Sequence, residues 1–363
     1  MSAIAGIASP GKRNEVENML KEMHYRGPMG SSILETKQAT LGVSWTEAQP
    51  EAPDLLQEIH QASDEAGDGH FATAQIVDER IVLKRDPLGI APLYYGQDSS
   101  GSLCFASEIK GLCRVTPQVN ELPPGSSFDG EKVEAYFQLQ EQDPMPNEAE
   151  KITQELRQRL EQSVLKHIGA GDVGCWLSGG LDSSALTALA NNYVDHLHTF
   201  AAGLPGAPDL EYARQVAEFV QSDHHEAIVQ PDQLADALPD VIYHLESFDA
   251  LLVRSSIMNY YVARLASEHV PAVFSGEGGD ELFAGYDYLK SLDLSALPGE
   301  LVDITTRLHN TALQRVDRSA SAHGTVAHIG FLDPEVVEYA LRIPVGLKLN
   351  EGVEKWILRQ AVA

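Results

Sequence analysis

Flexible backbone, hydroxyl groups and one carboxylate come together in residues 178–184, Ser-Gly-Gly-Leu-Asp-Ser-Ser, which follow an apolar run and open an expected helix. Paired glycines let the backbone approach an anion closely, so that several N–H groups can point into one concavity. The helix N-terminus and the serine hydroxyls add further attraction for a phosphate. Asp182 would repel a bare phosphate, which indicates a magnesium bridge. The string predicts a polyphosphate site, and a tight turn capped by serine or aspartate is the alternative.

This loop is not a Walker A motif, because the Gly-Lys-Ser ending is missing. Its polar groups are expected to stabilise charge on a polyphosphate and not to act as nucleophiles. The residues expected to surround the phosphate groups here are Ser178, Gly179, Gly180, Asp182, Ser183 and Ser184.

A second acidic loop, Ser-Gly-Glu-Gly-Gly-Asp-Glu over residues 275–281, follows another apolar run. Three carboxylates in a glycine-rich turn beside a polyphosphate require a metal ion or a substrate cation nearby. An exposed acidic turn is the alternative. The two loops face the same crevice if the strands before them belong to one parallel sheet.

Short apolar runs alternate with helical segments from residue 150 onward. Apolar residues recur every four positions from Ile152 to Val164 and predict a helix with one buried stripe. Strands are expected at 173–177, 197–204, 225–229 and 271–275, and helices from about 183 and over 209–221, 232–246 and 254–269. The alternation predicts a doubly wound parallel sheet. Ligands bind beyond the carboxyl ends of such strands, so we expect chemistry in the loops that follow them.

The first part of the chain is β-rich and is punctuated by Gly, Pro and Asp. Strands are expected at 70–77, 80–84, 92–96 and 102–107. Residues 141–150 contain two prolines among acidic residues, which suits an exposed connector. A chain of 363 residues predicts two domains. We place them at residues 1–145 and 146–363.

Composition narrows the range of partners. The 53 acidic and 26 basic residues give a net charge of −27, which repels nucleic-acid phosphates and anionic lipids, so neither is an expected partner. A general need for solubility explains this negative charge, and adaptation to a salt-rich cytoplasm is the more specific alternative. Cys104, Cys113 and Cys175 lack metal-ligand spacing and are expected to be buried free thiols. Neither a signal peptide nor a membrane-spanning run is visible, so a cytoplasmic location is expected.

The loop at 178–184 resembles the pyrophosphate-binding signature of the N-type ATP pyrophosphatases, and the rest of the chain resembles the glutamine-dependent asparagine synthetase family. The segments that carry this resemblance are YRGPMG (25–30), KRDPLGIAPLYYG (84–96), TFAAGLPGAPDLEYARQVAE (199–218), LESFDALLVRSS (245–256), FSGEGGDELFAGY (274–286), RSASAHGTVAHIGFLD (318–333) and EKWILRQA (354–361). The resemblance implies an α/β protein. Its N-terminal part would be an α+β sandwich of the Ntn-hydrolase type, and its C-terminal part a parallel sheet of the ATP-pyrophosphatase type with helical additions.

The resemblance also implies roles in the second acidic loop. Asp182 and Asp280 are the implied magnesium ligands. Glu277 is implied to lie near the acyl-adenylate and the incoming ammonia, which it would orient or deprotonate. Related β-lactam-forming synthetases carry a tyrosine at the position of Glu277, so amide formation is favoured here.

Further residues are implied around the nucleotide. Asp209 would lie near it, although a helix N-cap is the structural alternative. Arg254 could hold a carboxylate or phosphate with its planar fork, or form a surface ion pair. Leu177 and Gly276 are implied to surround the adenine. Lys355 is implied to balance charge on the leaving pyrophosphate, although a lysine on an amphipathic helix is usually only solvated.

The N-terminal part departs from the family. Family members with glutaminase activity expose a cysteine where this chain has Ser2. A terminal serine can act as a nucleophile with its own amine as base, but the family's Asn-Gly-Glu segment has no counterpart in residues 42–69, and Met29 replaces an acidic residue. Ser2 is therefore the candidate relic of a glutaminase nucleophile. Arg26 and Gly27 are expected to hold the fold.

The sequence as a whole predicts an ATP-dependent amide synthetase that uses Mg²⁺ and joins an acyl-adenylate to ammonia. Aspartate is the expected acid, although residues 325–329 lack the arginines usual in the family, which leaves the acid open. ATP, an amino acid and ammonia are the expected partners, and a homodimer is the candidate assembly. The alternatives are a ligase that joins a different acid and amine, and a non-catalytic nucleotide-binding homologue.

Overall fold

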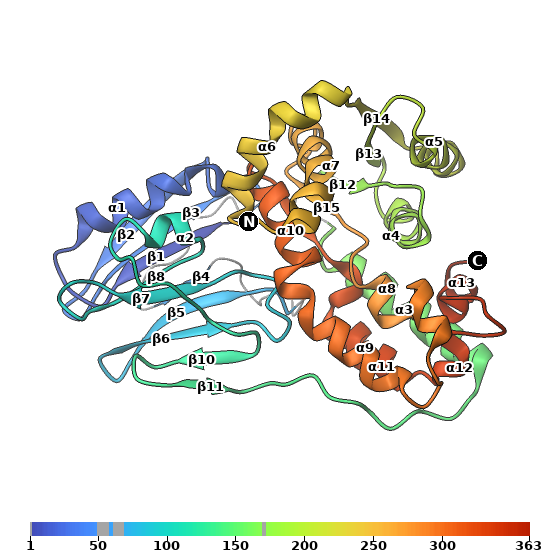
Figure 1. Ribbon diagram of the computed structural model, residues 1–363, viewed down its shortest axis with the longest axis horizontal. Helices are drawn as coiled ribbons and strands as arrows, with labels where there is room; N and C mark the ends of the chain where they lie inside the picture. The colour runs from blue at the N-terminus through green and yellow to red at the C-terminus, as the bar shows by residue number, and fades with distance from the viewer. Residues whose placement is uncertain (1, 49–57, 61–68, 169–171) are drawn as a thin grey trace.

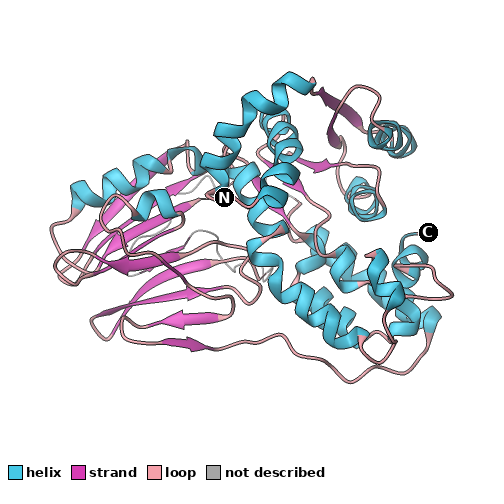
Figure 2. Cartoon of the chain, in the orientation of Figure 1, coloured by secondary structure: helices cyan, strands magenta, loops and turns pink. Residues whose placement is uncertain are grey.

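The computed structural model describes residues 2–48, 58–60, 69–168 and 172–363. The strands among these residues form two antiparallel sheets and one parallel sheet. The antiparallel sheets lie at one end of the molecule and the parallel sheet at the other (Figure 1). Figure 2 shows that most helices surround the parallel sheet. This architecture confirms the predicted α/β class.

The N-terminal part is a sandwich of the two antiparallel sheets. Strand order is β2-β3-β1-β8-β7-β9 in one sheet and β11-β10-β6-β5-β4 in the other. The strands are β1 (Ala3–Ile7), β2 (Gly30–Glu35), β3 (Thr40–Trp45), β4 (Glu58–His60), β5 (Ala72–Val77), β6 (Arg80–Arg85), β7 (Tyr94–Gln97), β8 (Leu103–Ala106), β9 (Asn120–Glu121), β10 (Ser126–Phe128) and β11 (Val133–Ala135). The inner faces share one core, in which Leu41 and Phe105 of the first sheet pack with Ala74 and Leu83 of the second.

Two helices cover the outer face of the first sheet. Val16 and Met19 of α1 (Arg13–Glu22) and Leu112 of α2 (Ile109–Leu112) share a second buried cluster with Ala5 and Cys104 of the sheet. Successive residues of a strand point to opposite faces, so β1 serves both cores. The helix layer and the paired sheets confirm the predicted α+β sandwich. The four strands expected from the sequence correspond to β5, β6, β7 and β8.

A long exposed connector leads from the sandwich to the second part of the chain. Residues 138–148 contain no helix or strand and are mostly exposed, and Figure 1 shows them crossing the lower edge of the molecule before α3 (Ala149–Leu165) begins. The expected connector is therefore present, but it ends at residue 148 because the helix starts earlier than predicted. The domain boundary at residue 145 falls inside this segment and stays a prediction.

The second part is built on a parallel sheet of order β14-β13-β12-β15-β16. Its elements are β12 (Val173–Trp176), α4 (Leu181–Asn191), β13 (His198–Gly203), α5 (Pro208–Val220), β14 (Asp223–Ile228), α6 (Pro231–Leu245), α7 (Ala250–Ser267), β15 (Ala272–Phe274) and β16 (Val326–His328). Helices α5 and α7 both pack on β13 and β14, and Figure 1 shows them on opposite faces of the sheet. The doubly wound sheet is thus confirmed, and β16 is an additional strand that was not predicted.

The remaining α-helices come after β15 in sequence, three before β16 and three after it. They are α8 (Gly279–Leu282), α9 (Leu297–Thr306), α10 (Ala312–Ser321), α11 (Pro334–Arg342), α12 (Val345–Lys348) and α13 (Trp356–Val362). Helix α13 packs against α3, so the segment that ends the chain is anchored to the segment that opens the second part. No helix among the described residues is both long enough and apolar enough to cross a membrane.

All three cysteines are free thiols, as expected. Cys104 and Cys175 are buried, and burial raises the pKa of each thiol to about 12. Cys113 is exposed, which corrects the expectation that all three would be buried. It is the C-cap residue of α2 and lies at the protein surface.

A buried ionic cluster joins the two parts of the protein. Arg26 donates to Glu108 at 2.8 Å within the sandwich and to Asp317 of α10 at 2.8 Å. Arg318 contacts Glu108 at 2.7 Å and Glu246 at 3.1 Å. Arg26, Glu108 and Arg318 are at most 1% exposed. This cluster gives a physical reason for the prediction that Arg26 holds the fold. Its buried charges keep their partners only while the two parts of the protein remain docked.

Acid should loosen this contact. Although burial opposes ionisation of Glu108, Arg318, Lys110 and Arg26 together hold the pKa of Glu108 well below its ordinary value of 4.5. A pKa depressed in the folded state gives stability that is present above the unfolded pKa and lost as pH falls through the folded one. We therefore expect the free energy of unfolding, measured with denaturant, to fall below about pH 4.5.

The Glu108→Gln variant tests which group is responsible. It should show a shallower decline in stability with falling pH than the wild type, because one titrating group of the cluster is gone. Glu131→Gln is the matched control, since Glu131 pairs with Arg80 on an exposed surface. Equal slopes for Glu108→Gln and the wild type would show that acid acts elsewhere.

Candidate active site

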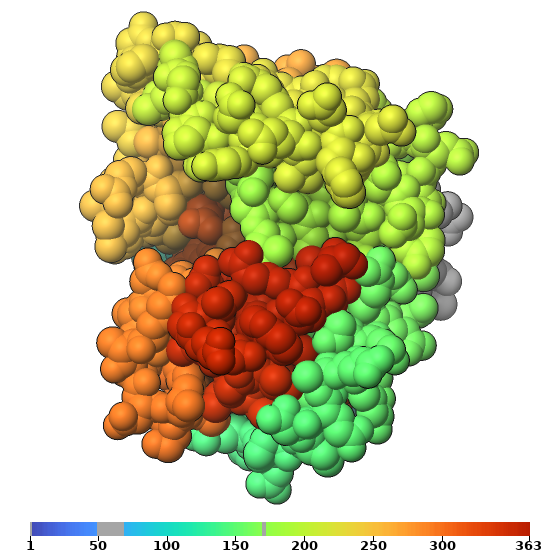
Figure 3. All heavy atoms as spheres, turned by 90° about the vertical axis from the view of Figure 1, so that its right-hand side faces the viewer, coloured from blue at the N-terminus to red at the C-terminus, as the bar shows by residue number. Residues whose placement is uncertain are grey.

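A cavity of about 430 Å³ lies beyond the carboxyl ends of β12, β13 and β15. Figure 3 shows a hollow between the segments that carry these strand ends and the C-terminal segment below them. The cavity is lined by Leu177, Ser178, Gly180, Asp182, Ser183, Asp209, Gly276, Glu277, Asp280 and Lys355, among others. Most of the site residues expected from the sequence therefore come together, in the loops where a parallel sheet is expected to bind its ligand.

Three expected residues are not part of the lining. Gly179 has a φ of +76° and lies so close to α5 that a Cβ would come within 2.6 Å of the Ala213 nitrogen. Ser184 Oγ is buried and has no hydrogen-bond partner within the described ranges. Arg254 is exposed on α7. Gly179 thus shapes the loop from behind, while the roles expected for Ser184 and Arg254 stay predictions.

Hydrogen bonds within the first loop fix the start of α4. The Ser183 hydroxyl accepts from the Ser178 amide at 3.2 Å and lies 3.0 Å from the Ser178 hydroxyl. Ser183 also donates to the Gly180 carbonyl at 3.2 Å. Gly180 is the N-cap of α4, so no side chain caps this helix. The loop keeps the helix N-terminus open toward the cavity, which is the arrangement that binds anions.

Lys355 connects the two acidic loops. Its Nζ lies 2.6 Å from Asp182 Oδ2 and 2.6 Å from Asp280 Oδ1. Burial opposes its charge, but the two carboxylates outweigh this effect and raise the pKa of Lys355. Lys355 has a φ of +54°, which is rare for a residue with a side chain. Such strain persists only where the surroundings enforce it, and here it holds the ammonium group between two acids.

Glycines make the close approach of these loops possible. A Cβ on Gly279 would come within 2.4 Å of Asp182 Cγ, and one on Gly285 within 2.1 Å of Lys355 Cε. At Gly279, and at Gly285 just after the loop, the backbone therefore presses directly against charged side chains of the site. Any side chain added there must displace the group that it meets.

Replacing Gly279 with alanine should reduce the reaction at this site about 100-fold, because a displacement of about 1 Å at reacting groups can cost that much. The backbone of Gly279 is helical, so the new methyl group acts mainly through its clash with Asp182. Gly346→Ala is the matched control, since no atom lies within 4 Å of its added Cβ. The measurement is the rate of pyrophosphate release from ATP, and equal rates for the two variants would contradict the argument.

Glu277 has a partner that the sequence did not reveal. Arg315 of α10 donates to Glu277 Oε1 at 2.8 Å, and both side chains are only about a fifth exposed. Arg315 is therefore a basic residue beside the acidic loop that was not among the expected site residues. Arg315 gives no local signal, since an arginine on an amphipathic helix is common.

The third carboxylate of the loop points elsewhere. Glu281 is buried and accepts a hydrogen bond from Tyr286. It does not line the cavity. Two of the three acids that were expected to face the ligand, Glu277 and Asp280, thus do so, and Glu281 supports the turn instead.

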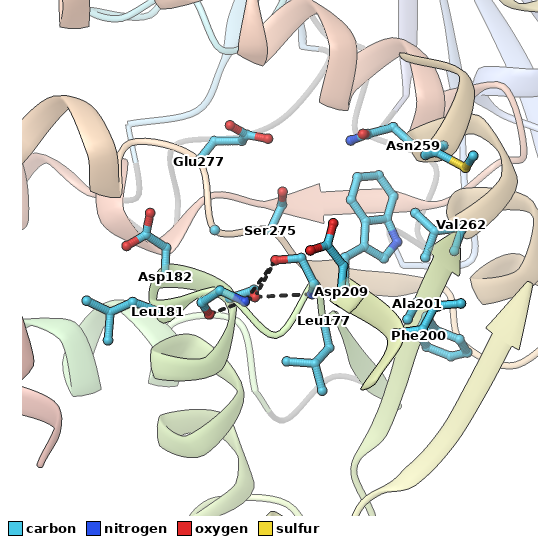
Figure 4. A pocket seen from close by; sticks show the side chains of 18 of the residues that line it. Leu177, Leu181, Asp182, Phe200, Ala201, Asp209, Asn259, Val262, Ser275 and Glu277 are labelled. Atoms are coloured by element: carbon cyan, nitrogen blue, oxygen red, sulfur yellow. Dashed lines mark hydrogen bonds between the residues drawn. The ribbon is translucent and has the colours of Figure 1, made fainter. Parts of the chain in front are cut away.

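The other side of the cavity is largely apolar. Trp176, Phe200, Met258 and Val262 line it together with the polar side chain of Asn259. Figure 4 places Asn259, Val262, Ala201 and Phe200 across the cavity from Asp182 and Glu277. Such a surface suits a flat heterocycle whose edge needs a few polar contacts. Leu177 lines the cavity, as expected. The side chains that α7 contributes to the lining were not predicted, because apolar residues on a helix usually indicate a buried core.

Asp209 lies in the first turn of α5 and lines the cavity. The N-cap of this helix is Ala207, so the alternative role proposed for Asp209 as a cap is wrong. Proline at position 208 occupies the first turn, which moves the helix start one residue earlier. The carboxylate is exposed and free to meet a ligand at the mouth of the cavity.

The charges around the loops fit a divalent cation. Among the described residues, Asp182, Asp280 and Glu277 form ion pairs only with Lys355 and Arg315, which leaves one negative charge in excess. Asp182 Oδ1 is buried and has no hydrogen-bond partner in the part of the chain that the structure describes. Burial raises the pKa of Asp182 to about 6 despite Lys355. Carboxylate oxygens are the ligands that Mg²⁺ prefers, so Asp182 and Asp280 could hold this ion.

Ser2 lies outside this cavity. It is 3% exposed, and its carbonyl accepts from Arg26 Nε at 3.3 Å. A Cβ on Gly27 would come within 2.3 Å of Ser44 Oγ, so this glycine packs tightly against β3. Much of the stretch that lacks the Asn-Gly-Glu segment lies outside the described residues. The interpretation of Ser2 as a relic stays a prediction.

Two family models match the chain. The model described as asparagine synthase matches residues 155–303 and 295–363, and the glutamine amidotransferase domain matches residues 55–174. Asparagine synthetase B (glutamine-hydrolysing) of Escherichia coli is 37% identical over 341 residues, which cover 86% of this chain and 59% of the relative.

Two yeast proteins show a similar likeness. A probable glutamine-hydrolysing asparagine synthetase of Schizosaccharomyces pombe is 37% identical over 78% of this chain and 56% of the relative. Asparagine synthetase 1 (glutamine-hydrolysing) of Saccharomyces cerevisiae is 36% identical over 81% of this chain and 60% of the relative. The chain thus spans somewhat more than half the length of these relatives. The identity, its extent and the two family matches together show that the chain belongs to the asparagine synthetase family.

Proposed function

We propose that this protein is an ATP-dependent amide synthetase that activates the side-chain carboxylate of aspartate as an acyl-adenylate and passes it to ammonia. The observation that carries this proposal is the bridge from Asp182 through Lys355 to Asp280, which joins two loops at the carboxyl edge of a parallel sheet. The cleft places an apolar surface on one side and these charges on the other. This division matches a nucleotide, which has a flat base and a polyanionic tail.

The loop at 178–184 would bind the departing pyrophosphate. The open N-terminus of α4 offers backbone N–H groups, and Lys355 offers a positive charge. Asp182 and Asp280 would hold Mg²⁺, which when bound neutralises charge on the phosphate oxygens. Fixing these groups in place before ATP arrives lowers the barrier, because little reorganisation is needed when charge develops.

Glu277 would serve the second half of the reaction. Its carboxylate is oriented by Arg315 and lines the cavity on the same side as Asp182. From there it can accept a hydrogen bond from ammonia and receive the proton that nitrogen loses when the amide bond forms. AMP then leaves, and the proton lost by the nitrogen stays on this carboxylate.

The direct test is a screen of pyrophosphate and AMP release by the full chain with ATP and Mg²⁺. We expect release with aspartate plus ammonium ions, and no release with glutamine in place of ammonium ions. Release with a different acid, but not with aspartate, would overturn the choice of aspartate. No release with any acid, alongside measurable ATP binding, would overturn the proposal in favour of a nucleotide-binding homologue.

A separate variant tests whether ammonia or glutamine is the nitrogen donor. If Ser2 is a relic, Ser2→Ala should leave ammonia-dependent release unchanged, and glutamine should remain inactive in both proteins. Glutamine-dependent release that disappears in Ser2→Ala would instead identify Ser2 as a working nucleophile. The proposed homodimer and cytoplasmic location await measurement of the molar mass in solution and localisation of the protein in cells.

A further inference from the structure

Three histidines converge at the edge of the parallel sheet opposite the candidate active site. His198 begins β13, His225 lies near the start of β14, and His269 lies between α7 and β15. One nitrogen of each ring lies within 4.8 Å of those of the other two. The group therefore lies at the amino ends of the strands, whereas the candidate active site lies beyond their carboxyl ends.

Strand pairing explains why two of these rings meet. His198 is the direct parallel partner of Asp223. His225 follows Asp223 by two positions, so both side chains point to the same face of the sheet as His198. His198 Nδ1 lies 3.2 Å from His225 Nε2, and Asp223 Oδ2 lies 3.5 Å from each of these nitrogens.

These atoms form a suitable donor set for a transition metal. Zinc binds histidine nitrogen at about 2.0–2.1 Å in tetrahedral geometry, which places two ligand nitrogens about 3.3 Å apart. The observed 3.2 Å between His198 and His225 agrees with this spacing. His269 is exposed, so an ion in solution can reach its ring. The Asp223 carboxylate supplies a fourth donor and negative charge.

The surroundings hold the first two rings in place. The buried Phe200 stacks on His225 with a centroid distance of 5.2 Å and on His198 at 6.3 Å. The two histidine side chains are 20% and 24% exposed, so an ion can reach them from solvent. Burial and the neighbouring His269 lower the pKa of His225, which favours the neutral ring that binds metals.

Simple ring stacking does not account for the whole arrangement. The rings of His225 and His269 pack at a tilt of 31° with their centroids 3.9 Å apart, which packing alone can explain. Packing does not require that one nitrogen of each of the three rings lies within 4.8 Å of those of the other two. A shared cation would bind all three nitrogens in place of the 3.2 Å hydrogen bond between His198 and His225.

We propose that His198, His225 and His269, with Asp223 as a fourth donor, form a binding site for Zn²⁺ or a similar divalent transition metal. The ion would connect edge strand β14 and strand β13 to the segment that follows α7. Its role is structural, because the site lies at the end of the sheet away from the cavity. The proposal is independent of the amide-forming activity.

The test is a titration of chelator-treated full chain with Zn²⁺ in the absence of ATP, followed by calorimetry. We expect one ion per chain at this site and a higher Tm in its presence. His269→Ala should weaken the affinity at least about tenfold, since even residues that only support a metal ligand commonly contribute that much. His269 is exposed, so this variant should keep its fold, which circular dichroism can verify.

Two controls separate this site from the rest of the protein. His196→Ala changes an exposed histidine outside the cluster and should leave zinc affinity unchanged. Asp182→Asn alters the candidate magnesium site and should leave the zinc stoichiometry unchanged. Wild-type affinity in His269→Ala, an equal loss in His196→Ala, or loss of binding in Asp182→Asn would each overturn the proposal. In the wild type, Co²⁺ should give the intense visible absorption of a tetrahedral site, and His225→Ala should abolish it.

Discussion

Replacing Lys355 with methionine should lower the rate of pyrophosphate release from ATP by about 10²–10³-fold, the range found when one preorganised charge-stabilising group is removed. Lys355 is the only basic residue among those lining the cavity in the described part of the chain. Its Nζ contacts Asp182 and Asp280 at 2.6 Å each. Without the ammonium group the two carboxylates face each other in a partly dry site, and the negative charge on ATP meets only further negative charge.

A second lysine provides a matched control for this variant. Lys290 also bridges two acids, Asp287 at 2.9 Å and Glu354 at 3.0 Å, but it is about a third exposed and does not line the cavity. Lys290→Met should therefore leave the rate close to that of the wild type, because solvent replaces its ion pairs. Measuring the Tm of both variants shows whether Lys355→Met is folded. A folded Lys355→Met protein within about tenfold of the wild-type rate would contradict the assigned role.

The parts of this site that could be predicted from the sequence are those whose signals are local. Residues 178–184 and 275–281 each place glycines and acids directly after an apolar run, and each lies where a parallel strand ends. The regular alternation of strands and helices then places both loops at one edge of a sheet. Lys355 carries no such signal, and its role was inferred from family resemblance alone.

What could not be predicted depends on contacts between distant segments. Arg315 meets Glu277 only because α10 packs beside the acidic loop, and an arginine on a helix gives no hint of that partner. Strand β16 has three residues, which are too few for a pattern of alternation to show. Arg26 and Asp317 lie 291 positions apart in the sequence. Their pairing follows from how the two parts dock, which hydrophobic periodicity does not encode.

Docking of the two parts leads to the second large prediction, which concerns stability. Arg26→Met should lower the free energy of unfolding by about 3–5 kcal/mol, because removing one partner of a buried ion pair leaves its counter-charges desolvated. Arg26 is fully buried and donates to Glu108, Asp317 and Ser321. Arg80→Met removes an ion pair whose side chains are 61% and 71% exposed and should have only a small fraction of this effect. Denaturant unfolding of both variants at neutral pH measures the difference.

A double-mutant cycle distinguishes loss of the ion pair from loss of packing. If uncompensated charge on Asp317 causes the instability, Arg26→Met combined with Asp317→Leu should be less destabilised than the sum of the two single variants. The double variant still leaves Glu108, but Arg318 contacts the same Glu108 oxygen at 2.7 Å and can neutralise it. Strict additivity would mean that Arg26 acts through its bulk alone. A positive coupling would mean that balanced charge holds the sandwich against the sheet that carries the candidate active site.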